Sequence, residues 1–168
     1  MSDIKLAYRY LESPVGDLLA ARDGETIHYV SFPTGRKAMK PAEAWVKDQH
    51  GFEELDAQLA AYFRGELKSF DLPLHLTGTD FQKSVWTALK EIPYGQTISY
   101  GVLAGRVGNP KASRAVGAAN GANPIPIIIP CHRVIGSDKS MTGFGGGVKT
   151  KEFLLKHEGV LADQPRLL

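Results

Sequence analysis

The longest apolar run of the chain, residues 125–129, ends at Pro130 and is followed at once by Cys131, the only cysteine in 168 residues. Proline can neither donate a hydrogen bond to a sheet nor continue a helix, so the chain must turn there. The run is far too short to span a membrane. The pattern predicts a buried strand whose end presents a thiol, with a titratable and a cationic residue directly after it.

Cys131 admits two interpretations. Free cysteines are among the most buried residue types and usually behave as small, inert hydrophobes. A thiolate, however, is favoured beside cationic or titratable groups, and His132 and Arg133 come next in the sequence. We therefore interpret Cys131 as a nucleophile. A single cysteine rules out a disulfide framework and the N-terminus lacks the apolar core of a signal peptide, so we expect a cytoplasmic protein in a reducing compartment.

Charge is distributed unevenly along the chain. Residues 1–77 carry nine Lys and Arg against twelve Asp and Glu, whereas residues 78–168 carry eleven against six. The second half is basic although the whole chain has a net charge of only +2. Such a half is typical of proteins that meet a polyanion, although solvated basic faces are also common. Nucleic acid is therefore one candidate partner.

The first 77 residues predict a small α/β domain. Alternating apolar and polar residues indicate strands, and Asp23-Gly24 is a strong hairpin signal between two of them. Residues 70–76 form either a further strand or the crossing to the second domain. No metal site is expected, because the histidines of this part have no partners at ligand spacing. The predicted elements are strands at 5–12, 17–22 and 26–32, and helices at 41–49 and 52–63.

Residues 78–168 predict a mostly helical domain instead. Thr79 and Gln82 match a capping box, so a helix begins there and ends before Pro93. Ser99 is the expected N-cap of a second, short helix. The chain is therefore predicted to be an α/β protein with two unlike halves.

The short second helix and the helix after it match a helix-turn-helix, a unit that docks on DNA. Asn109 is the expected N-cap of the later helix, with Pro110 at its first position. Its inner face is assigned to Ala112, Ala115, Val116 and Ala119, and its outer face to Lys111, Arg114 and Ala118. An ordinary helical hairpin has the same pattern, but two cations among small residues favour close approach to a phosphate backbone or a minor groove. Base readout in the major groove uses Asn, Gln or several Arg, and their scarcity predicts little sequence preference.

Three segments closely resemble the O6-alkylguanine-DNA alkyltransferases, also called methylated-DNA–protein-cysteine methyltransferases. They are residues 109–117, 123–126 and 130–134, which stand in the order and spacing of that family. The resemblance covers roughly half the chain and is to the stand-alone bacterial form. It implies a ribonuclease-H-like α/β domain at 1–77, followed at 78–168 by a DNA-binding and alkyl-acceptor domain that contains the helix-turn-helix.

The resemblance also implies a reaction, the direct reversal of DNA damage in a single turnover. The damaged guanine is flipped out of the duplex, and a cysteine takes the alkyl group from O6 irreversibly. O4-alkylthymine is a second candidate substrate, and no cofactor is expected. Cys131 matches the acceptor, His132 the histidine that deprotonates it through a water, and Glu158 the carboxylate that orients the imidazole.

Other positions match residues of the family that handle the base and the duplex. Tyr100 matches the tyrosine that hydrogen-bonds the flipped base and supplies a proton as guanine leaves. Asn123 matches the asparagine that braces the cysteine turn, and Arg114 matches the arginine that fills the space left by the base. Further DNA contacts are implied at Lys111, Ala112, Ser113 and Ala115, and the substrate pocket at Val134, Phe144, Gly145 and Gly146.

The resemblance implies a monomer that binds double-stranded DNA through the minor groove and does not associate with a membrane. Phe144 and Gly145 stand where animal-type members have tyrosine and serine, which leaves the accepted alkyl size open. The zinc ligands of some members include cysteines in the N-terminal domain. This chain has none there, so no metal of that kind is expected.

Three other classes of protein share part of the pattern. A cysteine peptidase also uses Cys and His, but a helix pair that faces a polyanion has no part in its chemistry. A DNA-binding regulator accounts for the helix pair and the charge but not for Cys131. Non-reactive alkyltransferase-like proteins replace the acceptor cysteine, which this chain retains.

Overall fold

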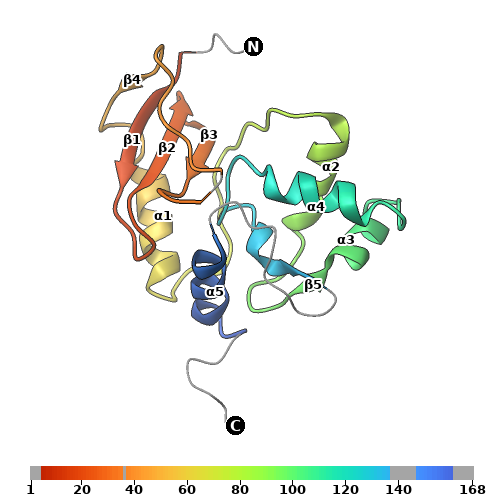
Figure 1. The fold of residues 1–168 in the computed structure, drawn as a ribbon. Helices are drawn as coiled ribbons and strands as arrows, with labels where there is room; N and C mark the ends of the chain where they lie inside the picture. The colour runs from red at the N-terminus through yellow and green to blue at the C-terminus, as the bar shows by residue number, and fades with distance from the viewer. Residues whose placement is uncertain (1–4, 36, 137–146, 161–168) are drawn as a thin grey trace.

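The N-terminal unit is built on a four-stranded sheet with the order β3-β2-β1-β4 (Figure 1). The structure is a computed structural model that describes residues 5–35, 37–136 and 147–160. Neighbouring strands are antiparallel except for β1 and β4, which are parallel. The strands are β1 (Ala7–Leu11), β2 (Leu18–Asp23), β3 (Thr26–Ser31) and β4 (Val46–Lys47). The three predicted strands are therefore confirmed, with β2 and β3 joined by the Asp23-Gly24 hairpin.

The helix predicted at 41–49 is wrong. This segment contains β4 instead, and the backbone N–H of Val46 donates to the Leu6 carbonyl at 2.8 Å. Trp45 stacks on Tyr29 with ring centroids 5.7 Å apart and also contacts the Tyr8 ring. Aromatic packing on the sheet and edge pairing thus override a weak local helix preference.

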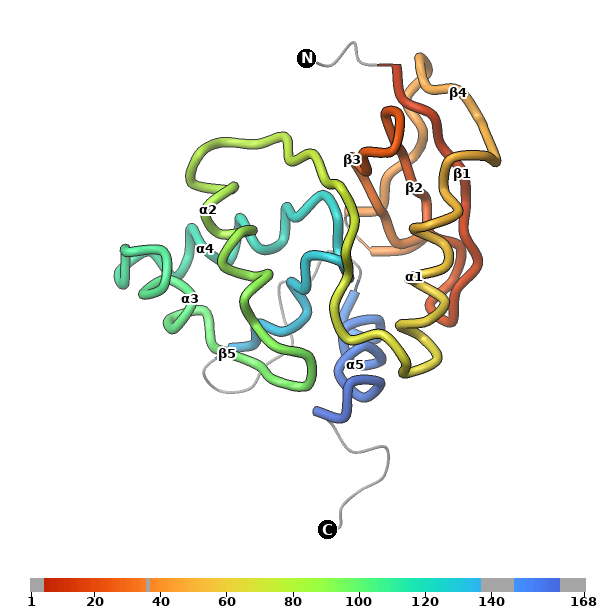
Figure 2. The backbone as a smooth tube through the Cα atoms, turned by 180° about the vertical axis from the view of Figure 1, so that it is seen from behind, coloured from red at the N-terminus to blue at the C-terminus, as the bar shows by residue number. Residues whose placement is uncertain are grey.

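The helix predicted at 52–63 is confirmed as α1 (Glu53–Phe63), whose buried residues are Leu55, Leu59 and Tyr62. The chain then crosses to the second unit along the junction between the two, as Figure 2 shows. On the way it runs beside β3, because Ile27 donates to the Pro73 carbonyl and His75 donates back to Ile27, both at 2.9 Å. The crossing therefore contributes a single bridge to the sheet rather than a full strand.

The C-terminal unit consists mainly of helices, as expected. The predicted capping box is present: Thr79 Oγ1 accepts from the Gln82 N–H at 3.1 Å, and Gln82 Oε1 accepts from the Thr79 N–H at 3.0 Å. Ser99 caps the next helix by accepting from the Val102 N–H. The helices are α2 (Asp80–Leu89), α3 (Tyr100–Arg106), α4 (Ser113–Gly121) and α5 (Val148–His157). None of the helices in the described ranges has the length and apolar character needed to cross a membrane.

The predicted start of α4 is wrong by several residues. Asn109 and Pro110 form a turn closed by a hydrogen bond from the Ala112 N–H to the Asn109 carbonyl, and Ala112 is the N-cap residue. Proline at the second position of such a turn competes with its use at a helix start. The later start also leaves Ala115 exposed rather than inward, while Val116 and Ala119 are buried as predicted.

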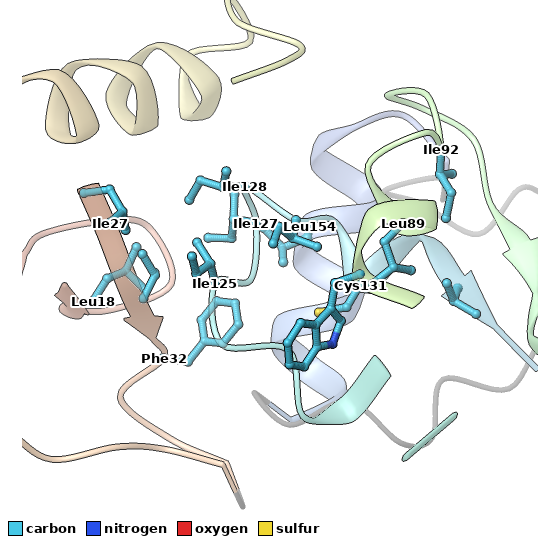
Figure 3. Packing of buried hydrophobic residues seen from close by; sticks show 14 of the residues in the cluster. Leu18, Ile27, Phe32, Leu89, Ile92, Ile125, Ile127, Ile128, Cys131 and Leu154 are labelled. Carbon is cyan, nitrogen blue, oxygen red and sulfur yellow. The ribbon is translucent and has the colours of Figure 1, made fainter. Parts of the chain in front are cut away.

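The apolar run 125–129 lies at the centre of the molecule. Figure 3 shows Ile125, Ile127 and Ile128 between sheet residues such as Leu18 and helical residues such as Leu89. The run is buried as predicted, but it is a turn rather than a strand. The Ile129 N–H donates to the Ile125 carbonyl at 2.9 Å, which closes the chain on itself.

Candidate active site

A tight turn at Pro130 delivers Cys131 to the site. Pro130 has φ −81° and ψ 67°, and the Cys131 N–H donates to the Ile129 carbonyl at 2.8 Å, which makes an inverse γ-turn. Cys131 then begins the single 3-10 turn η1 (Cys131–Arg133). Because such a turn has three residues, its three side chains point in different directions. The thiol and the His132 imidazole are therefore neighbours in sequence that serve different sides of the turn.

The side chains of two asparagines, Asn120 and Asn123, hydrogen-bond to the backbone of this turn and of the loop before it. Asn123 Nδ2 donates to the Ile129 carbonyl at 2.7 Å, and its Oδ1 accepts from the Ile125 N–H at 2.9 Å. Asn120 Nδ2 donates to the Cys131 carbonyl at 3.3 Å. Ile127 has φ 73°, a region that β-branched residues rarely adopt and that costs about 1–3 kcal/mol. These bonds keep a strained loop in place beneath the cysteine.

Glu158 lies at the centre of a buried polar cluster at the end of α5. Its Oε2 is 2.7 Å from His132 Nε2 and accepts from Tyr62 Oη at 2.6 Å. Arg133 binds both carboxylate oxygens, at 2.9 and 3.0 Å, and also donates to the Ile92 carbonyl. The Glu158 and His132 side chains are fully buried. The cluster therefore joins the adjacent imidazole and guanidinium of η1 to a carboxylate about 25 residues later in the sequence.

The backbone at both ends of this cluster requires glycine. Gly159 follows Glu158 with φ 83°, the C-terminal position expected from the sequence. Gly95 has φ 82°, and a Cβ there would lie 3.3 Å from the Glu158 carbonyl oxygen. Its N–H reaches Glu158 Oε1 at 3.3 Å. The close approach of the two segments thus depends on the missing side chain.

The cluster fixes the protonation states of its members. Burial opposes ionisation of Glu158, but hydrogen bonds from His132, Arg133 and Tyr62 outweigh burial and hold the pKa of the carboxyl well below its usual range. Burial lowers the pKa of His132, against the opposing effect of Glu158, so the imidazole is neutral. The carboxylate only accepts hydrogen bonds, so the imidazole proton is on Nε2. His132 Nδ1 is then a buried acceptor that has no hydrogen-bond partner in the described ranges.

At rest Cys131 is a thiol rather than a thiolate. Burial raises the pKa of the Cys131 thiol to about 11, although the Asn123 side chain and the charge of Lys151 partly oppose this. The neighbouring Arg133 does not serve the thiol, because it is bound to Glu158. Cys131 is 4% exposed and protonated, so reaction at neutral pH requires a base.

The short pairing of β5 (Ile98–Ser99) with β6 (Val134–Ile135) brings Tyr100 and Val134 close to the turn. Tyr100 begins α3 directly after β5, and its ring lies against Gly117 of α4. Burial, and then the nearby Cys131, raise the pKa of its phenol, which is therefore protonated. The Val134 carbonyl accepts from Lys151 Nζ at 2.6 Å. Cys131 also lines a pocket together with Phe32 and Pro126.

The residues assigned to DNA lie on the outer side of α4 and the turn before it. Four are exposed and Ala112 is partly buried. Ala115, assigned both to DNA and to the inner face of the helix, belongs to this exposed set. Three of the predicted pocket residues, Phe144, Gly145 and Gly146, lie outside the described residues. The exposed set is Lys111, Ser113, Arg114 and Ala115.

Two parts of the chain match models of one protein family. Residues 80–160 match 6-O-methylguanine DNA methyltransferase, DNA binding domain, and residues 6–76 match its ribonuclease-like domain. The methylated-DNA–protein-cysteine methyltransferase of Methanosarcina acetivorans is 57% identical over 152 residues, or 90% of this chain and 97% of the relative. The chain belongs to this family. It is a DNA repair methyltransferase that acts on O6-methylguanine by direct reversal.

The relatives of this methyltransferase also include bacterial proteins. The Haemophilus influenzae protein of the same name is 48% identical, over 92% of this chain and 87% of the relative. Mycobacterium tuberculosis OGT, crystallised in complex with DNA, superposes with a TM-score of 0.85 at 47% identity, over 90% of this chain and 92% of that one. The expected fold, a ribonuclease-like α/β domain with a helical DNA-binding domain, is confirmed.

The structure adds residues that the sequence did not single out for the site. Tyr62 lies on the buried, apolar face of α1, and a buried tyrosine hydroxyl needs a hydrogen-bond partner. Lys151 lies three residues before buried Leu154 on α5, and a lysine at that position of an apolar stripe was the available signal. Asn120 is buried beneath Cys131. All three lie within the same buried region as the predicted residues.

Proposed function

We propose that Cys131 is the acceptor and that it is used once per molecule. The observation that carries this proposal is that a chain belonging to the protein-cysteine methyltransferases has one cysteine, placed on a braced turn beside a neutral, buried imidazole. A thiol with a raised pKa needs such a base. The protein has no step that removes the alkyl group from the thioether that forms. Each molecule therefore reacts only once.

In the proposed transfer, one bond to the alkyl carbon forms as another breaks. The Cys131 sulfur forms a bond to the alkyl carbon as the bond from that carbon to O6 of guanine breaks. The thiol proton passes through a water to Nδ1 of His132, while Glu158 holds the opposite side of the ring. The Tyr100 hydroxyl donates a proton to the leaving guanine and regains one from His132. The net result is unmodified guanine and S-alkylcysteine.

For the DNA side, we propose minor-groove docking of α4 with little sequence preference. Support comes from the exposed surface of small residues and two cations around the start of α4. Arg114 would occupy the space left by the flipped base, while Lys111 contacts phosphate. We further propose that the protein acts as a monomer in a reducing, cytoplasmic setting, where the thiol stays free, and that O4-alkylthymine is a second substrate.

Arg114→Ala is expected to slow methyl transfer from a duplex by about tenfold or more, a loss of at least ~1.4 kcal/mol. Reaction with free O6-benzylguanine should be unchanged, because the free base needs no flipping. Single-turnover transfer to Cys131 is measured with both substrates.

Arg64→Ala is the matched control, since Arg64 is an exposed cation paired with Glu66 in the other unit. This control should leave both rates unchanged. Equal losses on both substrates for Arg114→Ala would place that residue in the pocket or the fold instead. Wild-type protein that reacts with neither substrate would overturn the proposed function itself.

A further inference from the structure

One side chain of the sheet unit enters the buried cluster around Glu158. Tyr62 is the tenth residue of α1, and its hydroxyl donates to Glu158 Oε2 at 2.6 Å across 96 residues of sequence. Tyr62 is fully buried. The other ligands of this carboxylate come from the C-terminal unit: His132, Arg133 and the backbone of Gly95. Tyr62 thus brings a hydroxyl of the N-terminal unit into direct contact with the carboxylate.

The contact is part of a wider clamp between α1 and α5. The Tyr62 carbonyl is 2.6 Å from His157 Nε2, one residue before Glu158. The two rings lie 4.9 Å apart, and Tyr62 also packs edge-on against Tyr94 at 6.1 Å. Both the backbone and the side chain of Tyr62 therefore restrain the end of α5, next to Glu158. Figure 1 shows α1 and α5 as neighbouring helices.

Three groups contact Glu158 Oε2, and together they determine the direction in which the carboxylate points. It meets His132 Nε2 at 2.7 Å, Tyr62 Oη at 2.6 Å and an Arg133 nitrogen at 3.0 Å. Arg133, bound to both oxygens, fixes the plane of the carboxylate but contacts it from one side only. A third donor, on the His132 side, restrains the carboxylate further.

We propose that Tyr62 is a positioning residue for the transfer reaction, its hydroxyl holding Glu158 against His132 so that the N-terminal unit completes the base that serves Cys131. This inference rests on the proposed function of Cys131 and His132. It assigns the ribonuclease-like domain a direct part in the chemistry through one hydroxyl. A purely structural tyrosine would support the fold without altering how His132 takes up a proton.

Removing the Tyr62 hydroxyl should change the pKa of His132 in a predictable direction. Glu158 faces His132, Arg133 and Tyr62, with the phenol of Tyr94 nearby. Without Oη, Glu158 is held less firmly against His132 and stabilises the protonated imidazole less, which lowers the pKa of His132. The charges of Arg133 and Lys151, which also lower that pKa, stay in place. The rate requires neutral His132, so the acidic limb of the pH–rate profile should move to lower pH.

Tyr62→Phe tests this, because it keeps the packed ring and removes only Oη. Tyr94→Phe is the matched control, because the Tyr94 hydroxyl lies nearby but donates to the His157 carbonyl, at 3.4 Å, rather than to Glu158. Single-turnover transfer to Cys131 is followed across pH with a methylated duplex and with free O6-benzylguanine. We expect Tyr62→Phe to lower the plateau rate about tenfold on both substrates and to shift the acidic limb to lower pH. Tyr94→Phe should match the wild type.

A double-mutant cycle separates positioning from general support of the fold. If Tyr62 acts through Glu158, adding Tyr62→Phe to Glu158→Gln should slow transfer by less than twofold more. Rates are taken below the melting temperature of each variant, so that only folded protein is compared. An unchanged profile for Tyr62→Phe, an equal effect of Tyr94→Phe, or full additivity with Glu158→Gln would overturn the inference. Failure of the wild type to methylate Cys131 would instead overturn the proposed function.

Discussion

Glu158→Gln should be the most damaging single change in the cluster, lowering the free energy of unfolding by about 3 kcal/mol. The substitution leaves Arg133, a buried guanidinium, without its counter-charge. It also replaces an acceptor that His132 and Tyr62 both use with an amide whose NH₂ group cannot accept. Methyl transfer should slow as well, because the imidazole loses the group that orients it.

The free energy of unfolding should depend on pH through the same carboxylate, that of Glu158. Its folded-state pKa lies below the ordinary value of 4.5, so its contribution is present above that pH and is lost as the pH falls below it. Wild-type protein should therefore lose stability on acidification, and Glu158→Gln should lack this part of the loss. Urea unfolding at neutral and acidic pH measures both. Equal stability of the two proteins at neutral pH would show that the ion pair contributes nothing.

Methylation of Cys131 should itself destabilise the protein, by about 1–3 kcal/mol. The cysteine is 4% exposed and belongs to the apolar core shared by both units. A methyl group added there acts as an overpacked substitution, and the thioether is a poor hydrogen-bond acceptor beside the Asn123 amide. For a domain of this size, each kcal/mol corresponds to a fall of about 2–4 °C in melting temperature.

Thermal unfolding before and after complete methylation measures this effect. Cys131→Ser taken through the same incubation is the control, since it cannot acquire the methyl group. The methylated protein should also be cut faster by protease. An unchanged or higher melting temperature would mean that the cavity beside Cys131 takes the methyl group without strain.

Local signals in the sequence predicted the elements that depend on neighbouring residues. The capping box at Thr79, the hairpin at Asp23-Gly24 and the helix end at Gly159 each involve contacts within a few residues. The helix predicted at 41–49 failed because Trp45 and Val46 respond to strands elsewhere in the chain. Local propensity carries no information about such partners.

In the candidate site too, contacts between neighbouring residues were predictable from the sequence, whereas contacts between distant residues were not. Cys131 and His132 are adjacent, so their association was visible in the sequence, and Glu158 entered through the family resemblance. Tyr62 could not be assigned, because its partner is 96 residues away. The protonation state of the thiol could not be derived from the sequence either, since burial is a property of the whole fold and here outweighs the charges nearby.

The central claim is that Cys131 accepts one alkyl group and is then spent. Intact mass spectrometry after incubation with an excess of duplex containing O6-methylguanine tests it most directly. Each chain should gain the mass of one methyl group and no more, peptide mapping should place it on Cys131, and Cys131→Ser should gain nothing. Repair of more than one lesion per chain, or a methyl group on any other residue, would contradict the account.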